Sequence, residues 1–126
     1  MYLRLLLAAV VFCLHLSPAH AERMVASYYA APTEKTIAHR SLPFGTRLRL
    51  TNPQTGKSVE GVVRDRGPGV PGVLIDVSHA FASLLGFTKA GHAPLEVQNL
   101  GVDPSQARPY YASVQRHSKR KTPTRH

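Results

Sequence analysis

The stretch Ala38-His39-Arg40-Ser41-Leu42-Pro43-Phe44-Gly45-Thr46 places a histidine directly before a forced turn. Pro43 fixes its own φ, and Gly45 lets the chain reverse before the next strand begins. A second stretch, Arg64-Asp65-Arg66-Gly67-Pro68-Gly69, puts a carboxylate where another strand ends in a loop. Because loops held by rigid strands concentrate binding and catalytic groups, the two stretches predict a cleft that contains both side chains.

The segments around these two stretches are typical of a small β domain. Met24–Tyr29 is rich in residues that suit a strand. Arg47–Asn52 alternates polar and apolar residues, a run of turn residues follows, and Ser58–Asp65 returns, so a hairpin is expected. Val73–Val77 is an apolar run broken by one acid, which indicates a buried strand.

A short helix is expected after this buried strand. Ser78 can cap its start and Gly86 can end it, because the apolar residues between them fall at helical spacing. Pro94–Leu100 is the last expected strand, with Leu95 and Val97 on one face. The sequence therefore predicts one short helix packed on a sheet or barrel.

The first residues have the pattern of a secretory signal peptide, which is predicted to span residues 1–21. Leu5–Leu16 is largely apolar, and Ala19-His20-Ala21 fits the small-x-small cleavage pattern. An uncleaved anchor is the alternative, but the apolar run is shorter than the roughly 20 residues that span a bilayer. Cys13, the single cysteine, lacks the setting of a lipoprotein signal. We expect an exported protein, periplasmic or extracellular, that is not a lipoprotein and has no disulfide.

The chain carries 16 Lys and Arg against 7 acids, and the excess is concentrated at its end. Six Lys and Arg and no acid lie from Arg108 onward. Residues 104–126 are predicted to be a basic, disordered tail, because the apolar periodicity has faded there. Its charge would attract nucleic acid, but export disfavours that partner. It also allows contact with anionic wall polymers or a membrane surface, and a solvated tail without a partner is the alternative.

Five motifs follow one another in order: Ala26-Ser27-Tyr28-Tyr29, the His39–Thr46 turn, Asp65-Arg66-Gly67-Pro68, Ile75-Asp76-Val77-Ser78 and the Ala82–Gly86 helix end. Together they resemble the rare lipoprotein A (RlpA) family over roughly residues 25–99. The resemblance implies a mainly β fold: a six-stranded double-psi β-barrel over residues 22–103 with one or two short helices. It also implies lytic transglycosylation, which cleaves peptidoglycan glycan strands and leaves an anhydro-sugar end.

Asp65 corresponds to the aspartate of the family's Asp-Arg-Gly-Pro motif and is the expected catalytic acid and base. Cleavage requires a proton on the leaving oxygen, and ring closure by the sugar's own hydroxyl needs no activated water. His39 is expected to assist by orienting Asp65, bonding a sugar hydroxyl or sharing a proton. The alternatives are a histidine that anchors its turn through the backbone and an aspartate that merely starts a turn.

Five further residues are expected to bind substrate. Tyr28 or Tyr29 offers a ring for stacking on a sugar, and strand alternation sends the other ring into the core or the solvent. By the same alternation, Arg64 and Arg66 either face away from the cleft or contact acidic groups of the substrate. Glu34 is the acid available for the role of a glutamate that the family carries before its histidine.

Two departures from the family pattern keep a second function open. The segment Ala30–Ile37 is shorter than its counterpart, and Gly69 stands where an aromatic residue commonly follows the Gly-Pro. The alternative is a non-catalytic peptidoglycan- or polysaccharide-binding barrel of the expansin type. Asp76 is expected to make a structural bond to the following helix or loop, with a role as a second site carboxylate as the alternative.

No cofactor or metal site is indicated, because the seven histidines are scattered and no cysteine pair exists. The resemblance implies a peptidoglycan glycan strand as the partner; a monomer is expected, and no nucleic acid is expected.

Overall fold

The computed structural model describes residues 21–31 and 34–110, which contain a closed six-stranded β-barrel. The strands are β1 (Glu22–Tyr29), β2 (Thr36–His39), β3 (Thr46–Thr51), β4 (Ser58–Asp65), β5 (Ile75–Ser78) and β6 (Ala93–Val102). Around the barrel they follow the order β1-β5-β2-β4-β3-β6. The β1–β5 and β2–β4 pairs are parallel, and the other four pairs are antiparallel. The mainly β, six-stranded barrel that the sequence predicted is confirmed.

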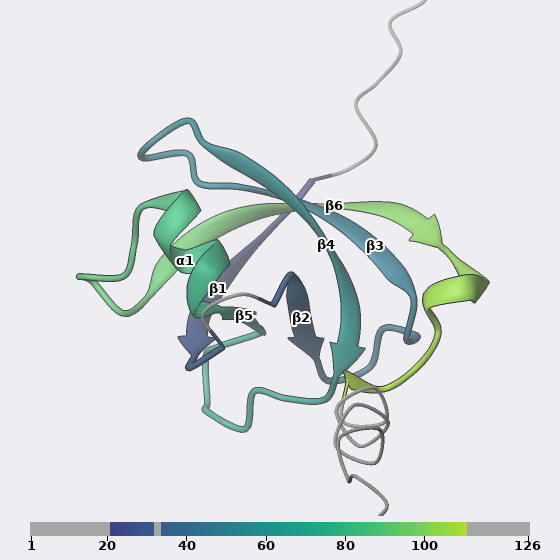
Figure 1. Ribbon diagram of the computed structural model, residues 1–126. Helices are drawn as coiled ribbons and strands as arrows, with labels where there is room; N and C mark the ends of the chain where they lie inside the picture. Colours follow the sequence, from purple (N-terminus) through teal and green to yellow (C-terminus); the bar gives the residue numbers. More distant parts are fainter. Residues whose placement is uncertain (1–20, 32–33, 111–126) are drawn as a thin grey trace, which may run out of the picture.

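One short helix, α1 (His79–Leu85), packs against the barrel next to β1 and β5 (Figure 1). The Ser78 side chain accepts a hydrogen bond from the backbone N–H of Phe81 at its start. Gly86 ends it in the left-handed conformation with φ of 79°. The two capping residues act as the sequence predicted.

The barrel interior is filled by residues at alternating positions of all six strands, whose side chains face inward. The apolar face of α1 extends the same core. The largest fully buried apolar side chains are Phe81, Ile37, Leu48, Leu50, Ile75, Leu85, Leu95, Val63 and Val77. Among the described residues, every buried side-chain nitrogen or oxygen has a hydrogen-bond partner. Asn52 is one of them, and its side-chain amide donates to the Leu85 carbonyl at 2.8 Å.

Gly45 shows why the turn after the histidine needs a glycine. Its φ is +92°, and an added Cβ would lie 2.5 Å from the Asp103 carbonyl oxygen. The Gly45 carbonyl accepts the Asp103 backbone N–H at 2.8 Å, so the chain that leaves β6 is held against this turn.

Several boundaries differ from the sequence prediction: β1 begins at Glu22 instead of Met24, and β3 spans Thr46–Thr51 instead of Arg47–Asn52. The fifth strand begins at Ile75 instead of Val73, because the Val73 N–H closes a turn onto the Val70 carbonyl. The sixth strand continues to Val102, where it pairs with Thr46. The tail was predicted from residue 104, but Pro104–Gln106 form a 3-10 helix whose first turn is capped by the preceding aspartate.

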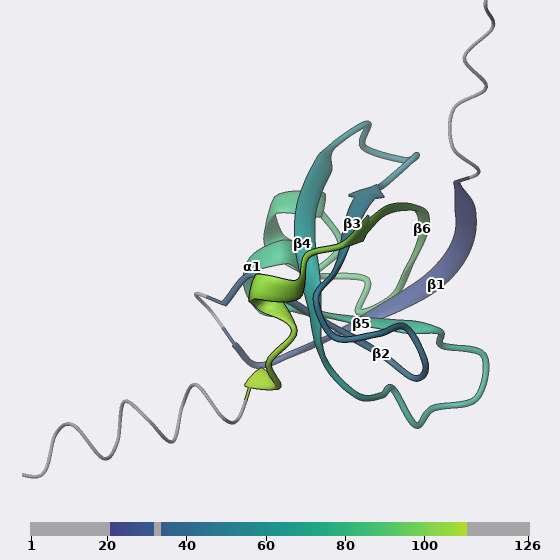
Figure 2. The same cartoon turned by 90° about the vertical axis from the view of Figure 1, so that its right-hand side faces the viewer.

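The described chain begins at β1 and ends after this 3-10 helix on opposite sides of the barrel (Figures 1 and 2). The predicted signal peptide, apart from Ala21, and the tail from residue 111 lie outside the described residues. Within the described part of the chain, no helix has the length and apolar character needed to cross a membrane.

Candidate functional site

Asp65 is the last residue of β4 and is partly exposed. It is in register with Ala38 of β2, next to an irregularity in the pairing of these two strands. Ala38 is also in register with Asp76 of β5, and Asp76 with Ser27 of β1. Residues in register share a face of a sheet, so four neighbouring strands present Ser27, Asp76, Ala38 and Asp65 in one row. We call these four residues the carboxylate row.

The carboxylate row points away from the core. Asp76 stands between Ile75 and Val77, whose side chains are fully buried, and strand alternation therefore directs Asp76 outward. Asp65 and Asp76 are both partly exposed. Their Cα atoms are separated by two strand spacings, roughly 9.5 Å. Ala38 lies between them in register and is itself buried, 3% exposed.

The Asp76 carboxyl is held in place from a neighbouring strand. Its Oδ1 accepts a hydrogen bond from the Ser27 hydroxyl at 3.0 Å. Burial raises the pKa of Asp76, and the bonds from Ser27 and from the Val77 backbone N–H oppose that shift. The sequence predicted a structural bond to the following helix or loop. That prediction was wrong about the side-chain partner, because the parallel pairing of β1 with β5 brings in Ser27 instead.

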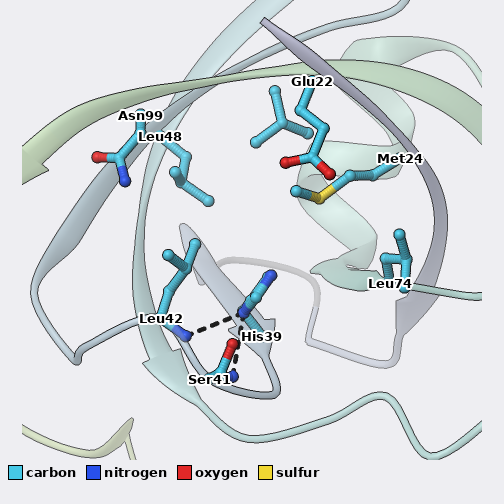
Figure 3. A pocket seen from close by; sticks show the side chains of 9 residues that line it. Glu22, Met24, His39, Ser41, Leu42, Leu48, Leu74 and Asn99 are labelled. Carbon is cyan, nitrogen blue, oxygen red and sulfur yellow. Dashed lines mark hydrogen bonds between the residues drawn. The ribbon is translucent and has the colours of Figure 1, made fainter. Parts of the chain in front are cut away.

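His39 faces a different space, a cavity of about 420 Å³ at one open end of the barrel. Met24, Leu48 and Val97 from the barrel interior line this cavity, together with polar groups of Glu22 and Asn99. Figure 3 shows the Glu22 carboxylate and the imidazole pointing into it from opposite sides. The neighbour of His39 on β2 belongs to the carboxylate row, so strand alternation turns the imidazole to the other side of the wall.

The His39 imidazole anchors its own turn. Its Nδ1 accepts the backbone N–H groups of Ser41 at 3.1 Å and Leu42 at 3.0 Å (Figure 3). Burial lowers the pKa of His39, the Arg66 charge lowers it further, and Glu22 opposes both. A neutral ring suits this geometry, because Nδ1 can accept two hydrogen bonds only without a proton. The turn-anchoring alternative is therefore the one that the hydrogen bonds support.

Arg66 connects the histidine turn to the end of β4. Its guanidinium donates to the His39 carbonyl at 3.1 Å and the Leu42 carbonyl at 2.7 Å. It also lies over the Phe44 ring, 4.0 Å from the centroid. Its backbone N–H donates to Asp65 Oδ1 at 2.8 Å. Arg66 thus binds both segments that the sequence predicted to be catalytic. Its side chain makes these contacts within the protein.

Arg40 binds the backbone of the loop that follows β4. Its guanidinium donates to the Pro68 carbonyl at 2.6 Å and the Val70 carbonyl at 3.2 Å. Arg64, predicted to contact substrate, donates to the Arg108 carbonyl at 3.1 Å and so meets the segment after β6. The arginines around Asp65 therefore bind backbone carbonyls of neighbouring loops. Substrate contacts by Arg64 and Arg66 stay predictions.

Both tyrosines of β1 are half-buried and hydrogen-bonded within the protein. Tyr28 donates to the Thr88 carbonyl at 2.9 Å, and its ring meets Phe87 edge-on with centroids 6.0 Å apart. Tyr29 bonds the Thr36 hydroxyl and donates to the Thr36 carbonyl at 3.1 Å. Burial raises the pKa of Tyr29, and the charges of Asp65 and Asp76 raise it further.

Glu34 lies just before β2 and is half-buried, and its predicted role at the site stays a prediction. Across residues 21–31 and 34–110, no cluster of three or more His, Cys, Asp or Glu side chains could hold a metal ion.

The fold and this arrangement define a double-psi β-barrel with a carboxylate row on its wall. The sequence model of the family described as "Lytic transglycolase" matches residues 28–97, and the chain belongs to this family. The match includes Asp65, Asp76 and His39.

Curated relatives support the same assignment. A probable endolytic peptidoglycan transglycosylase RlpA of Nostoc is 49% identical over 70 residues, which cover 56% of this chain and 19% of that protein. The endolytic peptidoglycan transglycosylase RlpA of Vibrio cholerae is 40% identical over 75 residues, covering 59% and 28%. The probable RlpA of Treponema pallidum is 41% identical over 88 residues, covering 70% and 26%. The chain thus spans less than a third of the length of these relatives.

Proposed function

We propose that this protein is a peptidoglycan lytic transglycosylase that cleaves glycan strands to anhydro-sugar ends. The observation that carries the proposal is Asp65, a partly exposed carboxyl on the barrel wall, inside the segment that matches the lytic transglycosylase family. Family membership and the names of the relatives support the activity and the substrate class. Because the proposed product forms without water, a single carboxyl group can serve both proton transfers.

Asp65 is the proposed acid and base. Its proton passes to the glycosidic oxygen as the bond between that oxygen and the anomeric carbon breaks. The 6-hydroxyl oxygen of the same sugar then bonds to the anomeric carbon, and its proton returns to the carboxylate. No atom is gained or lost, and the strand is cut into two ends, one of which carries the internal ether.

His39 assists Asp65 through the turn that it anchors. The imidazole fixes the backbone of Ser41 and Leu42, and the carbonyls of His39 and Leu42 hold the Arg66 guanidinium. Arg66 is the next residue after Asp65, so this chain of bonds sets where β4 ends and where its carboxyl group points. In this proposal, the neutral form of His39 positions the acid and takes no proton from the substrate.

The proposed setting is the cell wall. Substrate at the wall requires export, which the pattern of residues 1–21 favours. The partner is a glycan strand, and the basic charge after Arg108 adds attraction to anionic wall polymers.

The test compares wild-type protein with Asp65→Asn on purified peptidoglycan. Glu96→Gln is the matched control, because this partly exposed acid of β6 makes one long ion pair, 3.8 Å from Arg23. We expect anhydro-sugar products from the wild type and the control, and a loss of at least about 100-fold in Asp65→Asn, as for removal of a general acid. Wild-type protein that sediments with the wall and releases no product would overturn the proposal in favour of a binding barrel.

A further inference from the structure

The cavity at the open end of the barrel contains two polar groups that have no role in the mechanism above. His39 Nδ1 accepts the backbone N–H groups of its own turn, so the proton of the neutral ring is on Nε2. Within the described part of the chain, Nε2 has no hydrogen-bond partner, and the Glu22 carboxylate has neither an ion pair nor a hydrogen bond. Both groups point into the cavity, from opposite sides (Figure 3). The cavity therefore offers one N–H donor and one carboxylate acceptor that face each other.

The closed side of this cavity is apolar. Met24, Leu48 and Val97 line it from the barrel interior, and each is at most 8% exposed. Exposed Glu22 and Asn99 also line the cavity, so it opens to solvent on their side. Its volume of about 420 Å³ lies within the range of about 300–1,000 Å³ that is usual for small-molecule sites. A ligand that fits has an apolar end for the closed side and polar atoms nearer the mouth.

An acetamido group on a sugar ring matches this arrangement. A secondary amide is planar and almost always trans, so its N–H and its C=O point in opposite directions. His39 Nε2 can donate to the amide oxygen while the amide N–H donates to the Glu22 carboxylate. The acetyl methyl group ends the ligand, so it can rest against Met24 and Leu48, where a peptide chain would have to continue into the core.

We propose that the cavity binds the N-acetyl group of an amino sugar in the glycan strand. The proposal rests on the proposed function, because peptidoglycan glycan strands consist of N-acetylated amino sugars. The site is separate from the catalytic carboxyl group, since Asp65 does not line the cavity. His39 and Asp65 end the neighbouring parallel strands β2 and β4, so both lie at the same edge of the sheet. A strand that crosses this edge can place one sugar in the cavity and present another linkage to Asp65.

The test follows the Met24 methyl group by nuclear magnetic resonance. Met1 and Met24 are the two methionines of the chain, so carbon-13 labelling of methionine methyl groups gives one signal from the cavity, which Met24→Leu identifies. The probes are the β-1,4-linked trimer of N-acetylglucosamine and cellotriose, which has a hydroxyl in place of each acetamido group. We expect the N-acetylated trimer to shift the Met24 signal saturably. Its affinity should exceed that of cellotriose at least about tenfold, because the amide adds a hydrogen bond to a charged group.

Glu22→Ala removes the acceptor at the mouth of the cavity. Glu22 is exposed at the first residue of β1, so the variant should keep the fold. We expect its Kd for the N-acetylated trimer to rise at least about tenfold, with little change for cellotriose. Glu96→Ala is the matched control, because it removes an acid from the neighbouring strand β6 that does not line the cavity, and it should bind as the wild type does.

The inference is overturned by a Met24 signal that the N-acetylated trimer leaves unmoved, by equal affinity for the two trimers, or by wild-type affinity in Glu22→Ala. A sugar-free stem peptide that shifts the Met24 signal more than the trimer does also overturns it, in favour of a peptide site. Each of these results leaves the transglycosylase intact if the wild type releases anhydro-sugar products. Selective binding of the N-acetylated trimer by a protein that releases no such products supports the site and overturns the proposed catalysis.

Discussion

Gly61 of β4 lies directly against the Phe81 ring of α1. A Cβ added there would lie 2.4 Å from Phe81 Cε2 and 2.9 Å from Ile37 Cδ1. Phe81 is 2% exposed and Ile37 is 0% exposed, so neither side chain has free space into which to move. Gly61→Ala should therefore force the helix away from the sheet or push the ring off its rotamer.

The magnitude follows from two opposing effects. The phenyl carbon has to move by about 1 Å to regain ordinary contact, and overpacking of this kind costs about 1–3 kcal/mol. The change from Gly to Ala also restricts the unfolded chain, which stabilises the folded state by about 0.4–1 kcal/mol. We expect a net loss of about 1–2 kcal/mol in the free energy of unfolding. For a domain of this size the melting temperature should fall by roughly 4–16 °C.

Gly69→Ala is the matched control, since no atom lies within 4 Å of its added Cβ and its φ is not positive. Urea unfolding, followed by far-ultraviolet circular dichroism, should show this variant equal to the wild type or more stable by up to about 1 kcal/mol. A Gly61→Ala protein as stable as Gly69→Ala would refute the packing of α1 on β4.

Three further outcomes are expected. Arg66→Ala loses two hydrogen bonds to carbonyls and the contact with Phe44, and urea unfolding should show a loss of about 1–2 kcal/mol. Asn52→Ala removes the amide donor to the Leu85 carbonyl, which keeps the Thr55 hydroxyl at 3.0 Å, so the thermal midpoint should fall through a loss of about 0.5–1.5 kcal/mol. Because folding lowers the pKa of His39, the unfolded chain takes up this proton at a higher pH than the folded protein does. The free energy of unfolding should therefore decrease as the pH falls below 6.5. His39→Asn, whose amide can accept the same turn N–H, should show a smaller loss between about pH 7.5 and 5, and an equal loss would contradict the neutral imidazole.

Local signals in the sequence were sufficient for most elements of the fold. The alternation of Arg47–Asn52 and the return of Ser58–Asp65 predict the β3–β4 hairpin, because both strands pair with a chain neighbour. Ser78 and Gly86 predict the limits of α1 because capping depends on the few residues around each end. Asp65 and His39 were proposed as site residues from the turns that follow them.

Pairing between strands that are far apart in the sequence explains the contacts that could not be predicted. Asp76 and Ser27 are 49 residues apart, and only the parallel β1–β5 pair places them in register. The two sides of the barrel wall on which Asp65 and His39 face also depend on the irregular β2–β4 register. The 3-10 helix after β6 was missed because its support comes from Gly45, far earlier in the chain.

The most direct test of the central claim is to digest peptidoglycan, intact and stripped of stem peptides, in water enriched in oxygen-18. Mass spectrometry of the soluble products distinguishes the two reactions, since hydrolysis adds one labelled water and transglycosylation adds none. We expect anhydro-sugar ends without label, lost in Asp65→Asn and kept in Glu96→Gln. Labelled reducing ends would contradict a transglycosylase, and the absence of soluble products from folded, wall-bound protein would contradict catalysis by this barrel.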